Sequence, residues 1–369
     1  WESVTLNADN GAKGQQPWQF TVSSPRLDGR IIVPRAAPLN IELSRLQLPA
    51  TAPSVSEHGA PRSLLASVQP KLLPELDFSV SQLIVGDKPW GSLAFAMRKH
   101  EQGVVLRNLS GNLRGLQLGA DGRPLELVWQ RTASGDSTRL AGRVAVNDIG
   151  SVLKNWEFER VMESRSGQVD MDLQWPAAPD LFSPQALTGT TTLSFDNGRF
   201  LRGSEAASGT LRMVGILNFA NVIRRLQFDF KDVFEKGIHY DRIRGGMNFQ
   251  NGLMTMPKGL EIEGPSSTFK ISGSLDFNTD LTDMKLLATL PLSSNLPWVA
   301  AFIAGLPAAA GVYIASKVFE EQVDKASTLE YSVKGPWQNP QLEFIGLFGE
   351  RLPEGGDGSH KKMRGPGGR

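Results

Sequence analysis

Residues 247–256 read MNFQNGLMTM, and the fold class follows from this short pattern. Large apolar side chains alternate with polar ones on both sides of Asn251-Gly252. Alternation with a period of two is typical of a half-buried strand. An Asn-Gly pair between two such runs is the strongest short-range hairpin signal, because both central positions of its turn need a positive φ. The stretch therefore predicts an antiparallel hairpin with one apolar face.

The same alternation recurs outward from this hairpin in both directions. Between Gly189 and Leu290, large apolar residues are again spaced by two, and Asn197-Gly198 gives a second hairpin signal. Shorter runs, such as Trp18 to Val22, repeat the pattern through the first part of the chain. We therefore expect a mainly β protein built on antiparallel strands. The apolar face of these strands is the core of a sandwich, a face that lies under a helix, or an open concave surface that receives acyl chains.

A few short amphipathic helices are predicted within this β pattern. Residues 144–158 and 214–228 match each other as strand followed by helix, with Asp148 and Asn218 as N-caps. We expect helices near residues 148–157 and 218–236.

Composition divides the chain. Residues 49–74 are rich in Ala, Pro and Ser, which predicts a loop or strap across the sheet. The Gly-rich residues 346–369 predict a disordered tail. We therefore expect one β segment at 1–188, a second β segment at 189–345, and the tail.

One apolar helix is predicted from Leu296 to Ala315, LPWVAAFIAGLPAAAGVYIA, with an amphipathic continuation to residue 326. The stretch carries no charge, yet it is rich in Ala and Gly and contains Pro307, which disfavours a free membrane span. Three interpretations remain: a buried or groove-lining helix, a helix that enters or lies on a membrane, and a full span. The large residues that would line the groove or contact a membrane are Trp298, Phe302, Ile303, Leu306, Val312 and Ile314.

Several function classes are disfavoured by composition and motifs. The formal charge of +1 gives no field to steer nucleic acid, and the absence of cysteine removes thiolate sites and Cys nucleophiles. The four histidines lie far apart, and the common hydrolase, nucleotide and zinc motifs do not occur. Glu261 and Glu263 share a strand face but are expected on its solvated side. The sequence therefore predicts no enzyme, no metal and no cofactor.

The second half of the chain resembles a known family. The residues that carry the resemblance are ISGSLDF at 271–277, the apolar helix, and LEYSVKGPWQNP at 329–340, together with the Asn-Gly turns. This region is similar to the C-terminal part of the AsmA-like superfamily, and most closely to its YhdP-type envelope lipid-transport members. The resemblance implies a long twisted antiparallel sheet curled into an open apolar groove of the repeating β-groove type.

The resemblance also implies a function. Such proteins are non-enzymatic bridge-type carriers that move phospholipid between the inner and outer membranes, and this chain would be the outer-membrane-proximal end. We expect it in the periplasm or cell envelope, anchored to the inner membrane through an upstream segment and in contact with the inner leaflet of the outer membrane. The predicted lipid-binding groove residues are Phe195, Met247, Phe249, Met254, Met256, Ile262, Phe269, Ile271, Leu275, Phe277, Leu286 and Leu290.

An alternative function remains open at this point. The chain could be an envelope structural or assembly factor whose apolar helix docks a periplasmic or envelope protein partner, or the membrane. A hydrolase acting on lipid or glycan is disfavoured because no catalytic triad signal is present.

Overall fold

The computed structural model describes residues 5–10, 16–50, 63–201, 238–265, 267–291, 326–337 and 339–347. The predicted helices near 218–236 and 296–326 lie outside these residues, except that Ala326 begins a strand. The second copy of the predicted repeat, residues 214–228, also lies outside them. None of the described helices is long and apolar enough to cross a membrane.

The described residues form an 18-stranded sheet with three short helical elements. The first strands are β1 (Thr5–Asp9), β2 (Trp18–Ser23), β3 (Leu27–Val33), β4 (Leu39–Leu48), β5 (Leu76–Val85), β6 (Lys88–His100), β7 (Gly103–Leu113), β8 (Leu116–Leu118) and β9 (Leu125–Thr132). They are followed by β10 (Gly135–Val146), β11 (Met162–Trp175), β12 (Thr188–Phe200), β13 (Ile238–Gln250), β14 (Leu253–Glu263), β15 (Thr268–Asp276), β16 (Leu281–Pro291), β17 (Ala326–Pro336) and β18 (Gln341–Leu347). The helical elements are the 3₁₀ turns η1 (Pro70–Leu72) and η2 (Pro184–Ala186) and the α-helix α1 (Ile149–Asn155).

Strands lie side by side in chain order and pair with antiparallel register, so the predicted fold class is confirmed. Strands β8 and β9 share one position, because β7 and β10 each pair with both. The exception to the antiparallel rule is β4, which pairs with β5 in parallel. The division predicted at residues 188 and 189 stays a prediction, since β11 and β12 pair continuously there.

The two predicted Asn-Gly turns have different outcomes. Asn251-Gly252 joins β13 to β14 with φ values of 50° and 85°, as the hairpin pattern predicts. The hairpin predicted at Asn197-Gly198 is wrong, because both residues lie inside β12. Gly198 is needed there for close approach, since a Cβ atom would lie 2.0 Å from the Glu163 carbonyl oxygen and 2.3 Å from the Tyr240 hydroxyl.

Two other local predictions can be compared with the structure. The helix predicted near 148–157 is present as α1, and the Asp148 carboxylate accepts hydrogen bonds from the N–H groups of Gly150 and Ser151. The predicted start of the tail at residue 346 is wrong, because β18 continues through Gly346 to Leu347. Residues 348–369 lie outside the described residues.

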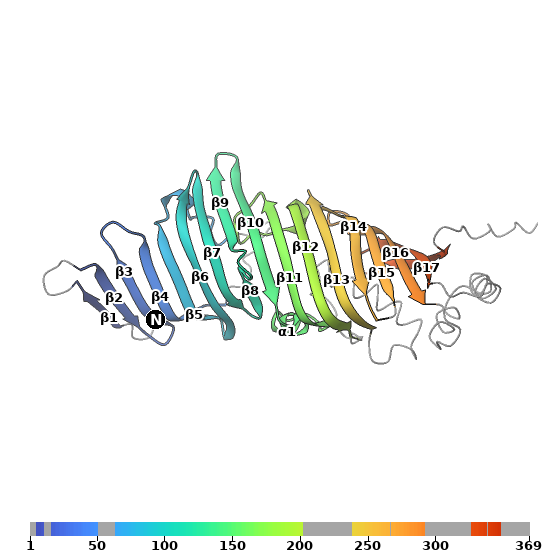
Figure 1. Cartoon of the computed structure of the whole chain (residues 1–369). Coiled ribbons are helices and arrows are strands. Elements are labelled where there is room, and N and C mark those ends of the chain that lie inside the picture. The colour runs from blue at the N-terminus through green and yellow to red at the C-terminus, as the bar shows by residue number, and fades with distance from the viewer. Residues whose placement is uncertain are drawn as a thin grey trace, which may run out of the picture.

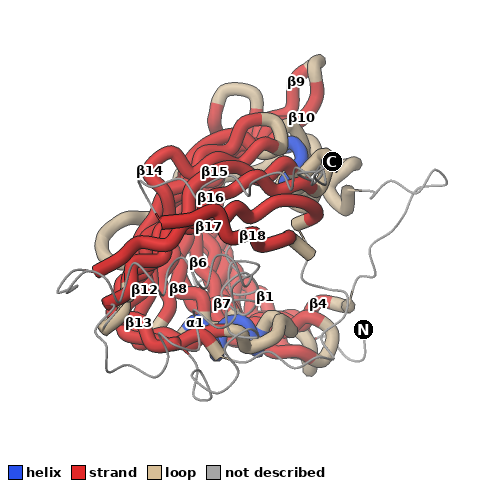
Figure 2. Tube along the Cα trace, turned by 90° about the vertical axis from the view of Figure 1, so that its right-hand side faces the viewer, coloured by secondary structure: helices blue, strands red, loops and turns tan. Residues whose placement is uncertain are grey.

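The sheet is a long ribbon that curls about its length. Figure 1 shows the strands side by side from β1 at one end to β17 at the other. Viewed from its end, the sheet is curved: the far-end strands β1 and β4 project to the lower part of the view and the near-end strands β14–β18 to the upper part (Figure 2). We call the side that carries α1 the concave face and the other side the convex face. The strand ends form two rims along the ribbon.

Apolar and charged side chains separate onto these two faces. On the convex face, arginines and aspartates pair across strands, with Arg139–Asp172 at 2.7 Å and Arg143–Asp170 at 2.8 Å. On the concave face, a cluster of buried apolar side chains extends over β10–β18 and α1. A smaller cluster lies on β6, β7 and β9. The alternation seen in the sequence thus becomes one apolar face and one polar face.

Candidate functional site

The candidate site is the concave face, on which apolar residues of neighbouring strands stand directly opposite one another. One such row crosses the sheet from β4 to β15 in unbroken register. Its members are Leu39, Leu76, Met97, Leu106, Leu127, Leu140, Leu173, Gly189, Phe249, Met254 and Leu275. Side chains opposite one another on neighbouring strands lie about 5 Å apart, so such a row forms a continuous apolar track.

The predicted groove residues that the structure describes lie together on this face. Ile262, Ile271, Leu275 and Leu286 are at most 1% exposed and form part of the larger core cluster. Phe195, Met247, Met254, Met256 and Phe269 are also buried. Phe249 and Phe277 are only partly buried and pack against the same cluster.

The remaining predicted site residues cannot be placed in the same way. The backbone of Leu290 pairs with Ser327, but its side chain is outside the description. The six residues predicted for the apolar helix, namely Trp298, Phe302, Ile303, Leu306, Val312 and Ile314, lie outside the described residues. Whether any predicted residue contacts lipid therefore stays a prediction.

Sequence reasoning did not assign the first part of the chain to the site, although the apolar face continues there. Phe20, Ile31, Ile41, Phe78 and Phe95 stand opposite one another across β2–β6. All five are only half-buried, in contrast to the core residues of β14–β16. The period-two pattern of these strands was enough to predict that these side chains share one apolar face. It could not predict how far they would be exposed to solvent.

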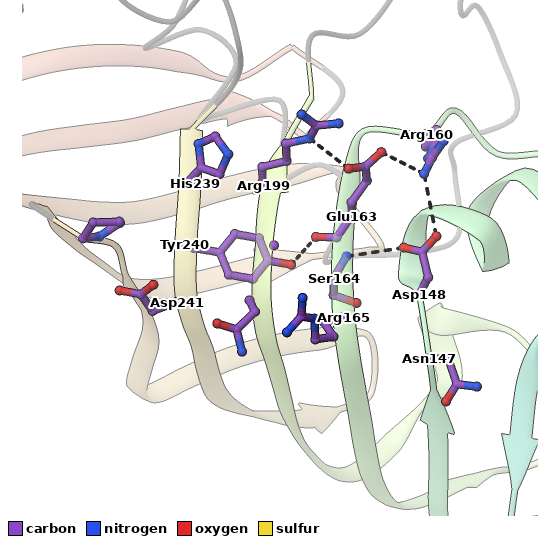
Figure 3. Close-up of a pocket in the computed structure, with 13 residues that line it drawn as sticks. Asn147, Asp148, Arg160, Glu163, Ser164, Arg165, Arg199, His239, Tyr240 and Asp241 are labelled. Atoms are coloured by element: carbon purple, nitrogen blue, oxygen red, sulfur yellow. Dashed lines mark hydrogen bonds and ion pairs between the residues drawn. The ribbon is translucent and has the colours of Figure 1, made fainter.

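A polar cleft of about 680 Å³ lies at one rim, where β11–β13 meet α1. Figure 3 shows the ion pairs around Glu163 on β11. Its carboxylate accepts from Arg160 at 2.7 Å and from Arg199 at 2.8 Å, and Arg160 also lies 3.7 Å from Asp148. A carboxylate engaged by two guanidinium groups stabilises local structure and is poorly placed to act as a general base.

The cleft forms where the inward–outward alternation of β11, β12 and β13 shifts by one residue. Ladder pairing is interrupted at a row of three residues, Arg165, Asn197 and Asp241, and Asn197 has a φ of 50°. Beyond this row the buried positions shift, so that Ser164 and Tyr240 are buried.

Tyr240 occupies the space left open by this shift. Its hydroxyl donates to the Glu163 carbonyl oxygen at 2.6 Å, reaching over the backbone of Gly198 (Figure 3). Burial raises the pKa of the Tyr240 phenol, so it stays a neutral donor. The cleft is thus a packed polar edge of the core.

The described residues form neither a pair of carboxylates suited to acid–base catalysis nor a cluster suited to binding a metal ion. Glu263 pairs with Arg242 at 3.3 Å, and Glu261 stands opposite Lys270 and Arg244. Both glutamates are on the charged face, as the alternation predicts. Within the described ranges, no three His, Asp or Glu side chains gather as a possible metal site.

Comparison with known proteins gives two matches. The sequence model of the YhdP family, described as YhdP protein, matches residues 1–342. The intermembrane phospholipid transporter YhdP of Escherichia coli strain K12 is 26% identical over 229 residues, which cover 62% of this chain and 18% of that protein. The chain therefore spans only a small part of that relative. No solved structure matches significantly.

Proposed function

Because the chain belongs to the YhdP family, we propose that its concave face carries phospholipid, with acyl chains against the apolar rows and the headgroup in water. The relative in Escherichia coli is named an intermembrane phospholipid transporter. By this proposal, the chain is one segment of such a transporter and performs no covalent chemistry. Phospholipid is then the cargo, and no cofactor is needed.

The observation that carries the proposal is the unbroken apolar register across the sheet. An acyl chain exposed to water costs about 0.8 kcal/mol for each methylene group. An acyl chain that moves from Phe78 to Leu106 and on to Leu173 would keep apolar contact at each step. Leu106 and Leu173 belong to one row, and Phe78 lies in the row beside it on the same face. Such a surface lowers the barrier to movement without an energy source, so transfer is passive.

The proposal has a finer part that concerns place and direction. We infer that the protein works in the cell envelope, with this chain toward the outer membrane and an inner-membrane anchor upstream. The twelve groove residues predicted from the sequence would contact acyl chains, with Phe249 and Phe277 the most accessible among those described. The helix predicted at 296–315 would cap the groove or contact the outer-membrane inner leaflet.

Native mass spectrometry with lipid extraction tests the proposal on protein purified without added lipid. Phe20→Asp and Phe249→Asp place a charge on half-buried positions of the concave face and should abolish copurifying phospholipid. Thr21→Asp and Asn248→Asp are matched controls, because these exposed neighbours point to the convex face. The controls should retain lipid.

Two outcomes would contradict the proposal. One is a lipid-free mass for the unmodified protein under every purification condition, which would favour the structural or partner-docking function. The other is equal lipid loss in the concave-face and convex-face variants.

A further inference from the structure

The parallel pair β4–β5 forces the chain to cross the sheet from one rim to the other. The chain leaves β4 beside Gly86, whose N–H donates to the Leu48 carbonyl oxygen at 2.8 Å. It rejoins the sheet beside Leu39, whose N–H donates to the Glu75 carbonyl oxygen at 2.9 Å. Two strands that run in the same direction need such a crossover. The connection between them therefore changes rims.

The described part of this connection lies on the concave face. We call residues 63–75 the strap. Its apolar side chains Leu65, Val68 and Leu73 pack against the cluster that contains the buried Val104 and Trp129. Because Val104 and Trp129 belong to the concave face of β7 and β9, the strap covers apolar surface that the sheet would otherwise leave open.

Two residues of the sheet bond to the strap: the Lys99 N–H donates to the Glu75 carboxylate at 3.2 Å, and Arg131 makes the larger set of contacts. The Arg131 guanidinium donates to the carbonyl oxygens of Val68 at 2.7 Å and Ala66 at 3.0 Å. It is oriented by Asp136, with two hydrogen bonds of 2.8 and 2.9 Å, and it lies over the Trp129 ring. These contacts are polar and directional, so they can break and reform without rearranging the sheet.

A second segment contacts the strap. The loop of residues 176–183 places Ala178 in the same cluster, where it is 1% exposed. Its Asp180 accepts from the Ser63 hydroxyl at 2.8 Å and from the Leu64 N–H at 2.6 Å. The strap is thus tied at Asp180 on this loop and at Arg131 on the sheet.

The opposite rim is also covered at this point of the ribbon. There α1 packs on the concave face with Trp156 and Leu116. Three apolar side chains of the covering segments remain exposed, namely Leu64 at 59%, Leu72 at 80% and Phe182 at 40%.

From these contacts we propose that the strap is a gate on the concave face, closed in this structure, and that lipid passes between the β1–β5 and β10–β18 stretches only when the strap leaves β6–β9. The proposal rests on the function proposed above. The strap leaves the sheet when its hydrogen bonds to Arg131 and Asp180 break. Helix α1 stays in place because Asp148 caps its N-terminus.

A reversible lock tests the gate, and residues 1–369 contain no cysteine that could compete with it. Ser63→Cys combined with Asp180→Cys in the full-length protein, expressed in its host cell, removes the tie when reduced and makes it covalent when oxidised. A photo-crosslinking phenylalanine analogue at Phe20 or Phe249 reports lipid on either side of the strap. In the oxidised form, crosslinked phospholipid at one of the two positions should fall to background, and reductant should restore it.

A second disulfide controls for oxidation and for rigidity of the sheet. Arg139→Cys combined with Gln174→Cys joins β10 to β11 on the convex face, where the two residues stand directly opposite each other. This lock should leave lipid crosslinking unchanged at both positions.

The outcomes separate the gate from the proposed function. Equal lipid crosslinking at both positions in fully oxidised and reduced Ser63–Asp180 variants would overturn the gate alone. No lipid at either position in any state would instead contradict lipid carriage.

Hydrogen exchange supplies a measurement that needs no variant. The strap amides of Val68, Leu72 and Leu73 are bonded within the strap, and they should exchange through a local opening. Their exchange should be faster than that of the Val104 and Trp129 amides beneath them. Exchange of the strap only together with these sheet amides would overturn the gate.

Discussion

The two ends of the ribbon share one strand pattern but differ in how their concave faces are covered. In β14–β16, Ile262, Ile271 and Leu286 are at most 1% exposed and belong to a continuous core. In β3–β5, Ile31, Ile41 and Phe78 occupy equivalent positions and remain half-exposed. Val22, Leu43 and Val80 of the same face are buried, so the same alternation yields a continuous core at one end and a partly accessible apolar surface at the other. By the proposed function, lipid contact is expected first at the partly accessible end.

The largest expected effect contrasts two isoleucines that share this face. Ile271→Ala should lower the local free energy of opening by about 3 kcal/mol, because it leaves a cavity in a packed core. Ile41→Ala should cost about 1 kcal/mol, because its side chain is only partly buried and leaves a smaller cavity. Hydrogen exchange of the neighbouring strand amides measures both. Equal costs would mean that the accessible end is also packed in solution.

The strap separates the two ends, and Arg131→Ala should loosen it. The change removes the hydrogen bonds to Asp136 and to the strap carbonyls, and bonds of charged groups contribute about 2 kcal/mol. Arg139→Ala is the matched control, because Arg139 also binds an aspartate twice, but both side chains are 50% exposed. Its cost should stay below about 1 kcal/mol. Exchange of the Val68 and Leu73 amides should increase in the first variant alone.

A smaller effect is expected where the accessible end meets α1. The guanidinium of Arg114 lies 5.7 Å from the Trp90 ring centre and 5.8 Å from that of Trp156. Arg114→Lys keeps the charge but loses planar stacking, which should cost about 1 kcal/mol. Tryptophan fluorescence during denaturant unfolding would detect it. Arg107→Lys, at a solvent-exposed pair with Glu126, should leave the transition unchanged.

The smallest expected effect is a pH dependence of strap opening, which tests whether the Arg131–Asp136 pair holds the strap. The hydrogen bonds from Arg131 hold the pKa of Asp136 below its usual value. A lowered folded-state pKa contributes stability above the unfolded value of about 3.9, and this contribution is lost as pH falls through the folded value. Strap amides, corrected for intrinsic rates, should therefore open more readily as the solution is acidified below about pH 4. Asp136→Asn should remove this dependence; a variant that keeps it would assign the titration to another group.

The sequence alone determined the elements whose information is local. Period-two alternation predicted the strands and their apolar face, Asn251-Gly252 predicted a hairpin, and Asp148 predicted the start of α1. Each of these depends on residues within a few positions of one another. The resemblance to the AsmA-like superfamily correctly predicted the long curled sheet and the YhdP family.

Only the tertiary structure decided what depends on distant neighbours. Asn197-Gly198 is a strand interior because Tyr240 and Glu163, far away in sequence, pack against Gly198. The parallel pairing of β4 with β5 has no local signal, since no turn residue specifies it. Ile271 is 1% exposed whereas Ile41 is only half-buried, although the alternation places both on the same face. A local pattern fixes which face is apolar, whereas coverage of that face depends on segments brought together by the fold.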